Sequence, residues 1–186
     1  MGFLDNLKKI IGGGTNVVTG SNKSFDVVIP NMPADLTSFK ALPQASLVSP
    51  YDTAALCVVA LSFYPKDREL CYAALDFLRG PRPLSGVDKQ FINDRFMDGK
   101  DYLMRSYFNG ATPQNDYAPS EPHTVTVSEN PYSRDNAGYL KLFIRSGGAD
   151  SPREIVLRNA KDGKWYLWDQ FLLSDIRAPE STNPWA

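Results

Sequence analysis

The sequence predicts an α+β protein in which a helical amino-terminal half packs on an antiparallel sheet from the carboxy-terminal half. Apolar residues recur at helical spacing as far as Phe108, whereas from Thr124 onward they alternate with polar residues, as in half-buried strands. The pair Asp162-Gly163 separates the last two alternating segments, and this pair is typical of a tight hairpin turn. About four helices and four to five strands are therefore expected.

Residues 1–22 are expected to form an amphipathic helix followed by a glycine-rich linker. A helix of about ten residues is only marginally stable alone, so we expect it to dock onto a protein. Peripheral attachment to a membrane through the same side chains is the alternative. The apolar residues of this helix are Phe3, Leu4, Leu7, Ile10 and Ile11.

A single α+β domain is expected over residues 23–178, and residues 179–186 are expected to form a surface tail. The domain should begin with an edge strand, because residues 25–29 are rich in β-branched side chains and stop at Pro30. Proline has no N–H to donate to a sheet ladder, which confines it to edges and ends of strands. One helical turn is expected near residues 35–39.

The main helix is expected to begin after Ser49. Serine is a preferred N-cap residue, and Pro50 suits the first helical position because its missing N–H would have no partner there. The residues that follow are apolar on every face until Pro65 ends the helix. A helix without a polar face is buried all round, so we predict that it forms the centre of the core.

Three further helices are predicted before the sheet. Asp67 caps the first, which ends at Gly80, and Ser85 caps the second, which stops at Gly99. The third is shorter. Its buried side consists of Tyr102, Leu103, Tyr107 and Phe108.

Four segments of alternating polarity predict the main strands of the sheet. They cover residues 124–128, 139–145, 154–158 and 165–171. These strands should form an antiparallel meander, which residues 25–29 extend by a fifth strand.

Composition argues against several functional classes. The chain has 186 residues and a formal net charge of −1, and positive charge is not concentrated in any segment, so nucleic acid is not an expected partner. The amino terminus lacks the order of a secretory signal. The longest apolar run, residues 54–61, is much shorter than the roughly 20 residues that span a bilayer. A cytoplasmic location is therefore expected.

The residues that most often carry chemistry are scarce in this sequence. Cys57 and Cys71 fall at similar heights in a predicted helical hairpin; buried, reduced thiols are favoured, and a disulfide or redox pair is the alternative. His123 is the only histidine, and it is expected to be an ordinary residue at a strand end. The acids Asp94, Asp98 and Asp101 lack the spacing of a calcium loop. No metal, cofactor or catalytic residue is predicted.

The final strand carries aromatic residues on both faces. Alternation places Trp165 and Leu167 on one face and Tyr166 and Trp168 on the other. Both faces cannot meet the same core, so the outer face is either covered by the tail or lines a groove for a ligand or partner. The candidate binding residues are Tyr166 and Trp168, together with Tyr139 and Phe143 of an earlier strand.

Three segments of the chain resemble an uncharacterised family of bacterial, clostridial-type proteins, over roughly residues 25 to 180. They are residues 49–55 (SPYDTAA), 77–80 (FLRG) and 163–168 (GKWYLW). This resemblance implies no activity, cofactor or catalytic residue. Separately, residues 162–165 (DGKW) are similar to the last hairpin of NTF2-like folds, in which helices pack into a curved sheet around a pocket. The four helices ahead of the main strands depart from the usual NTF2-like order.

The sequence favours a non-enzymatic intracellular module that binds an unknown protein or small ligand. An enzyme with an NTF2-like pocket is the first alternative, with His123 or a carboxylate such as Asp52 acting beside tyrosines. A peripheral membrane protein held by residues 3–11 is the second.

Overall fold

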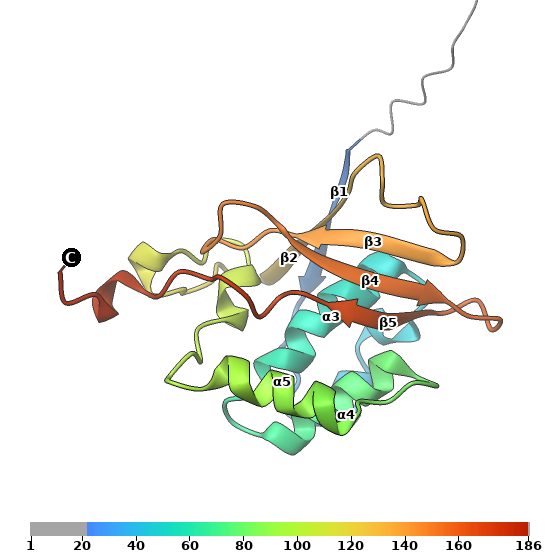
Figure 1. Ribbon diagram of the computed structural model, residues 1–186, viewed down its shortest axis with the longest axis horizontal. Coiled ribbons are helices and arrows are strands. Elements are labelled where there is room, and N and C mark those ends of the chain that lie inside the picture. The colour runs from blue at the N-terminus through green and yellow to red at the C-terminus, as the bar shows by residue number, and fades with distance from the viewer. Residues whose placement is uncertain (1–21, 186) are drawn as a thin grey trace, which may run out of the picture.

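The central helix α3 (Pro50–Ser62) lies against one face of a five-stranded antiparallel sheet in the computed structural model, which describes residues 22–185 (Figure 1). The strands follow chain order across the sheet, and their pairing confirms the predicted α+β class and the fifth strand. Their bounds are β1 Lys23–Ile29, β2 His123–Glu129, β3 Tyr139–Ile144, β4 Arg153–Asn159 and β5 Trp165–Gln170.

Helix α3 is the centre of the core, as its sequence predicts. The Ser49 side chain accepts a hydrogen bond from the backbone N–H of Asp52, and Pro50 occupies the first turn. Every residue from 53 to 61 is buried, and the helix contacts all five strands. A helix that is apolar all round gains free energy from burial on every face, which explains its position between the sheet and the other helices.

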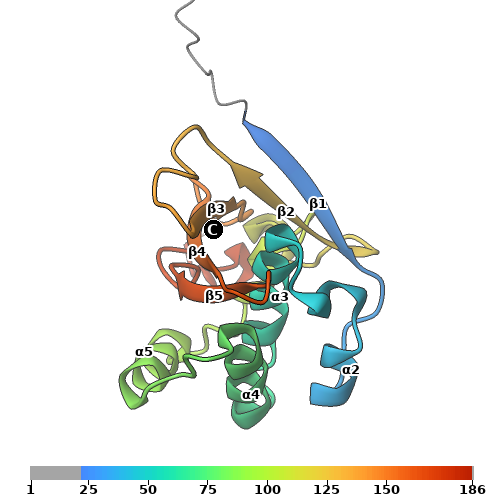
Figure 2. The same cartoon turned by 90° about the vertical axis from the view of Figure 1, so that its right-hand side faces the viewer.

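The remaining α-helices lie on the same side of the sheet as α3. They are α2 (Leu36–Lys40), α4 (Arg68–Arg79) and α5 (Gly86–Phe96). The predicted caps are confirmed: Asp67 accepts from the N–H of Leu70, and Ser85 forms a capping box with Asp88. Figure 2 shows α4 between α2 and α5.

The predicted short helix over residues 102–108 is wrong in type. The chain forms only a 3₁₀ helix, Met104–Tyr107. Phe108 forms an isolated bridge to Val125, and the N–H of Asn109 donates to the carbonyl of Thr124. The backbone from Phe108 onward therefore pairs with β2 instead of continuing a helix.

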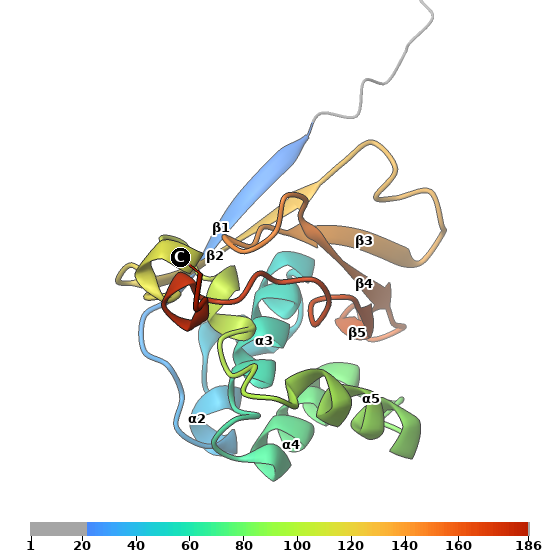
Figure 3. The same ribbon diagram turned by 60° about the vertical axis from the view of Figure 1, so that its left-hand side comes forward.

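The sheet has one face on the helices and one face away from them (Figure 3). Strand alternation directs the buried side chains of β2 to β5 toward α3, as expected for a half-buried antiparallel sheet. These residues are Val125, Val127, Leu140, Leu142, Ile144, Ile155, Leu157 and Leu167. The opposite face carries the candidate residues of the sequence analysis.

Cys57 and Cys71 are both buried and free rather than bridged. Within residues 22–185, the structure contains no helix that is long and apolar enough to cross a membrane. The predicted helix over residues 3–11 lies outside the described residues.

Candidate functional site

Trp168 is the extra residue of a β-bulge in the edge strand β5. Leu157 of β4 pairs with Leu167, but the next residue, Val156, pairs with Asp169. Trp168 therefore has no partner across the strand pair. A bulge bends its strand and changes the direction of a side chain. Here it leaves the indole 36% exposed.

The Trp168 indole is held by charged and aromatic neighbours from three other segments. The Arg82 guanidinium carbon lies 4.1 Å from the centre of the indole. Tyr139 of β3 meets the same indole edge-on, with ring centres 5.5 Å apart. The Arg158 guanidinium lies 4.2 Å from the Tyr139 ring centre and 5.7 Å from that of Trp168. The distances from the two guanidinium groups to the rings are those of cation–π contacts.

The backbone carbonyl of Trp168 is bound by two arginines that follow one another closely in the chain. Nη1 of Arg79 donates to this oxygen at 3.4 Å, and Nη1 of Arg82 donates at 3.2 Å. Because β5 is at the sheet edge, this carbonyl has no further strand to bind. Side chains that occupy such a group also prevent another chain from pairing with the edge.

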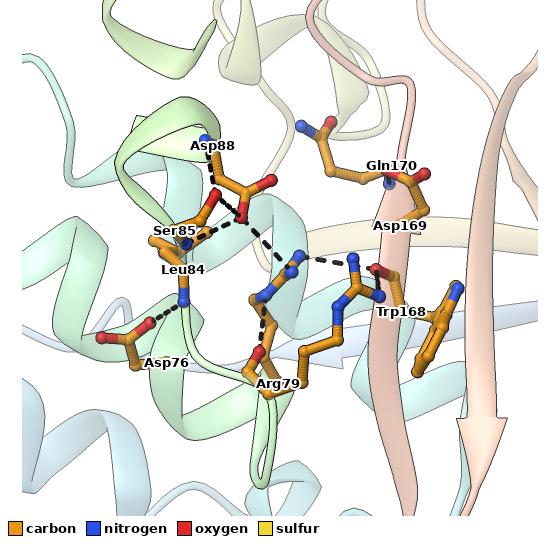
Figure 4. Close-up of polar contacts among 9 residues, drawn as sticks. Asp76, Arg79, Leu84, Ser85, Asp88, Trp168, Asp169 and Gln170 are labelled. Carbon is orange, nitrogen blue, oxygen red and sulfur yellow. Dashed lines mark hydrogen bonds and ion pairs between the residues drawn. The ribbon is translucent and has the colours of Figure 1, made fainter. Parts of the chain in front are cut away.

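Arg79 connects α4, α5 and β5, and its side chain is only 6% exposed. Figure 4 shows its guanidinium between Asp88 and the Trp168 carbonyl. Nε donates to the carbonyl of Arg82 at 3.0 Å. Nη2 lies 3.6 Å from the Asp88 carboxylate, which is close enough for an ion pair but too far for a hydrogen bond.

The environment of the Asp88 carboxylate favours its ionised form, which faces Arg79. Partial burial would raise the pKa of Asp88, but hydrogen bonds from Ser85 and the positive charges of Arg79 and Arg82 outweigh it and lower the pKa. Asp88 is therefore ionised at neutral pH, and it compensates much of the Arg79 charge.

The Trp168 pocket is a hollow of about 310 Å³ on this side of β5. Its charged and apolar lining includes Pro81, Arg82, Arg158, Lys161, Tyr166 and Trp168. The lining contains no carboxylate. The pocket therefore combines aromatic surface with positive charge.

Tyr166 forms one wall of the Trp168 pocket and is fixed at both ends. Its ring packs against the backbone of Gly80, where a Cβ would lie 2.3 Å from Cε1 of the ring. Its hydroxyl donates to the Asp162 carboxylate at 2.7 Å. This bond raises the pKa of Tyr166 and lowers the pKa of Asp162.

Two further hollows adjoin these residues. One, of about 390 Å³, lies on the outer face of the sheet and is lined by Tyr139, Lys141 and Trp168 among others. The other, of about 300 Å³, lies between α4, α5 and β5, where Arg79 adjoins mainly apolar side chains such as Phe91. Trp168 thus lines two of these three hollows, the Trp168 pocket and the one on the outer face of the sheet.

The structure brings three of the four candidate residues together. Tyr139 and Trp168 are in contact, and Tyr166 lines the Trp168 pocket. Phe143 is separate: it pairs with Ser128 and Glu154 toward the other end of β3 and lines none of the hollows beside Trp168.

Sequence reasoning missed the three arginines of the site. Arg79 and Arg82 flank the Gly80-Pro81 helix end, and Arg158 is at an outward position of β4. For Arg79 and Arg82, the position beside the expected end of a helix was a signal that could have identified them as site residues. Arg82 and Arg158 meet at the Trp168 indole, and Arg79 binds the Trp168 carbonyl, at a bulge in β5 that alternation does not predict.

The residues of the enzyme alternative lie elsewhere. His123 is the first residue of β2; its Nδ1 lies 3.1 Å from the Glu121 carboxylate, and its ring meets Phe108 edge-on. Asp52 lies in the first turn of α3, where burial raises its pKa. Neither lines a hollow beside Trp168. Among residues 22–185, no three His, Cys, Asp or Glu side chains are placed to hold a metal ion.

Comparison with known proteins gives a family without an assigned activity. Residues 31–180 match a family model described as "Domain of unknown function (DUF6935)". No curated protein and no solved structure matches the chain. The resemblance to an uncharacterised family is thereby confirmed, while bacterial origin and similarity to NTF2-like folds stay predictions.

Proposed function

The chain belongs to the DUF6935 family, a domain of unknown function, and on that premise we propose that it is a non-enzymatic, intracellular binding module whose small ligand occupies the Trp168 pocket. The observation that carries this proposal is the position of the Trp168 indole. A β-bulge presents it at the sheet edge, and side chains from three other segments fix it beside a hollow.

The dimensions of the pocket favour a small ligand. A volume of about 310 Å³ lies at the lower end of the range of small-molecule sites, roughly 300–1,000 Å³. Such sites combine apolar and aromatic walls with a few polar groups that orient the ligand. Tyr166 and Trp168 provide the aromatic walls, and the arginines provide the polar groups.

The edge of β5 is less suited to binding an extended peptide by strand addition. Arg79 and Arg82 already occupy the outward carbonyl of Trp168, and the Asp169 side chain accepts from the N–H of Gln170. A peptide strand would have to displace these groups before it could pair with β5. The geometry therefore favours a ligand in the pocket over a strand on the edge.

A thermal-shift screen with two matched variants tests this proposal. Trp168→Ala removes the indole from the pocket. Trp185→Ala removes an indole that is 92% exposed and outside the site. Compounds that bind in the pocket should raise the melting temperature of the wild type and of Trp185→Ala but not that of Trp168→Ala. Equal shifts in all three proteins would place the ligand elsewhere and reject the proposal.

A further inference from the structure

Three cations at the Trp168 pocket form no ion pair with an acid among the described residues. They are Arg82, Arg158 and Lys161, and none of them forms an ion pair within residues 22–185. Asp162, which follows Lys161 in the chain, instead accepts from the Tyr166 hydroxyl and from the N–H of Lys164. The Arg82 charge also acts on Asp88, but the ion pair of Asp88 is with Arg79. The pocket therefore carries positive charge that the fold leaves largely uncompensated.

These cations are also close to one another. The guanidinium carbons of Arg82 and Arg158 lie 4.1 and 5.7 Å from the same indole centre. They are thus within about one Debye length of each other at 0.1 M salt, roughly 10 Å. Like charges at this separation repel, and a bound anion removes the repulsion. The arrangement is more favourable with an anion present than without one.

Contacts within the fold account for the position of Arg79, and in part for that of Arg82, but not for the positions of Arg158 and Lys161. Arg79 is at the carboxyl end of α4, where positive charge is stabilised, and it faces Asp88. Arg82 binds the Trp168 carbonyl. Arg158 and Lys161 come from β4 and the following hairpin, and neither side chain makes a hydrogen bond within the part of the chain that the structure describes. Their donors are available to a ligand.

We infer that the Trp168 pocket recognises the phosphate group of a small phosphorylated molecule, an inference that rests on the proposed function. Guanidinium groups bind phosphate through parallel N–H···O bonds, and they suit phosphate because of their planar fork of donors. A phosphate monoester carries close to two negative charges at neutral pH. It therefore matches several uncompensated cations better than a single carboxylate does.

The remaining walls define the rest of this ligand. Pro81, Tyr166 and Trp168 give the pocket apolar surface beside its cations. Aromatic rings of this kind pack against flat apolar groups with ring centres about 4.5–7 Å apart. The ligand is thus a phosphate ester whose organic part includes an apolar or planar group.

Phenyl phosphate is a suitable probe, with benzyl alcohol as its uncharged counterpart. Binding is followed by tryptophan fluorescence of the full chain. Phenyl phosphate should bind saturably. Its affinity should fall as salt increases, because salt screens the attraction between the phosphate and the arginines. Benzyl alcohol should bind at least about tenfold more weakly, since hydrogen bonds to charged groups contribute about 1.5–3 kcal/mol.

Charge variants assign the effect to these residues. The double variant Arg82→Gln/Arg158→Gln should weaken phenyl phosphate binding at least about tenfold. The control Arg145→Gln/Lys66→Gln removes two exposed cations outside this pocket and should change binding less than about twofold. If the double variant is unstable, Lys161→Gln replaces it, since Lys161 is in an exposed hairpin. Lys161→Gln should likewise weaken phenyl phosphate binding.

The outcomes separate this inference from the proposed function. If benzyl alcohol binds as tightly as phenyl phosphate and the arginine variants bind both normally, the phosphate inference fails while ligand binding in the pocket stands. If Trp168→Ala also binds like wild type, both fail. A phosphotyrosine peptide that binds more than about tenfold tighter than phenyl phosphate, with the same arginine dependence, would contradict a small-molecule ligand and indicate a phosphorylated protein.

Discussion

The ring of Tyr166 occupies the space that a side chain at Gly80 would need. A Cβ on Gly80 would lie 2.3 Å from Cε1 of Tyr166, and Gly80 has a φ of +56°. Glycine is therefore required both by the close approach and by the left-handed backbone. This contact sets the distance between the end of α4 and β5, and so shapes the Trp168 pocket.

Gly80→Ala should destabilise the protein by about 2–4 kcal/mol, because it adds a steric clash to backbone strain. The measurement is urea unfolding followed by circular dichroism. Gly86→Ala is the matched control: a Cβ there meets no atom within 4 Å, so it should change stability by less than about 1 kcal/mol. Equal losses for the two variants would contradict this role for Gly80.

Arg79→Met should lower the free energy of unfolding by about 2–4 kcal/mol. The change keeps apolar bulk but leaves the Trp168 and Arg82 carbonyls with fewer donors and removes the buried partner of Asp88. Arg82→Met should cost less than about 1 kcal/mol, since Arg82 is exposed. A similar loss for both in chemical denaturation would show that Arg79 does not anchor this junction.

Neither cysteine should react with a thiol reagent such as Ellman's reagent in the native protein at pH 8. Burial raises the pKa of the Cys57 thiol to about 12 and raises that of Cys71 still further above its ordinary range. The reactive thiolate is therefore scarce, and access is blocked. Both thiols should react in guanidinium chloride. Fast reaction of one equivalent before unfolding would refute the buried placement.

Stability should decrease at alkaline pH. The folded-state pKa of Cys57 is raised from the ordinary value of 9.0 to about 12, so the unfolded chain loses this proton first as pH rises. Burial also raises the pKa of Tyr72 and Tyr117 to about 12. These three groups stabilise the folded state fully below their pKa values in the unfolded chain. This stabilisation is lost as the pH rises from about 9 to about 12. A melting temperature that stays constant from pH 8 to pH 11 would contradict this.

The sequence predicted most of the fold because its local signals agree with the tertiary structure. Ser49, Asp67 and Ser85 cap helices as their types indicate. The apolar run in α3 identified the buried helix, and Asp162-Gly163 marked the last hairpin. These features depend on residues that are neighbours in the chain, which is why the sequence reveals them.

The site was less accessible to sequence reasoning because it depends on contacts between distant residues. Alternation placed Tyr166 and Trp168 on one face, but the bulge at Trp168 gives the indole its own direction. The indole so directed contacts Tyr139 and Arg82, whereas Phe143 lies toward the other end of β3. The 3₁₀ helix at Met104–Tyr107 replaced an expected helix for a similar reason, since hydrogen bonds to β2 ended it.

Removal of the Trp168 indole should affect ligand binding much more than folding. The exposed cation–π contact with Arg82 contributes about 0.5–1 kcal/mol, so Trp168→Ala should unfold at nearly the same urea concentration as Trp185→Ala. A loss above about 3 kcal/mol, typical of a core aromatic, would show that Trp168 belongs to the core and not to a binding surface.

The central claim, that a small ligand occupies the Trp168 pocket, is tested most directly by the indole N–H signals in a ¹H–¹⁵N NMR spectrum. The chain has 3 tryptophans, and Trp168→Ala and Trp185→Ala assign two of the signals by their disappearance. On titration with phenyl phosphate, or with any compound that raises the melting temperature, the Trp168 signal should shift saturably while that of Trp185 stays in place. Compounds that stabilise the protein and leave the Trp168 signal unmoved would contradict the account.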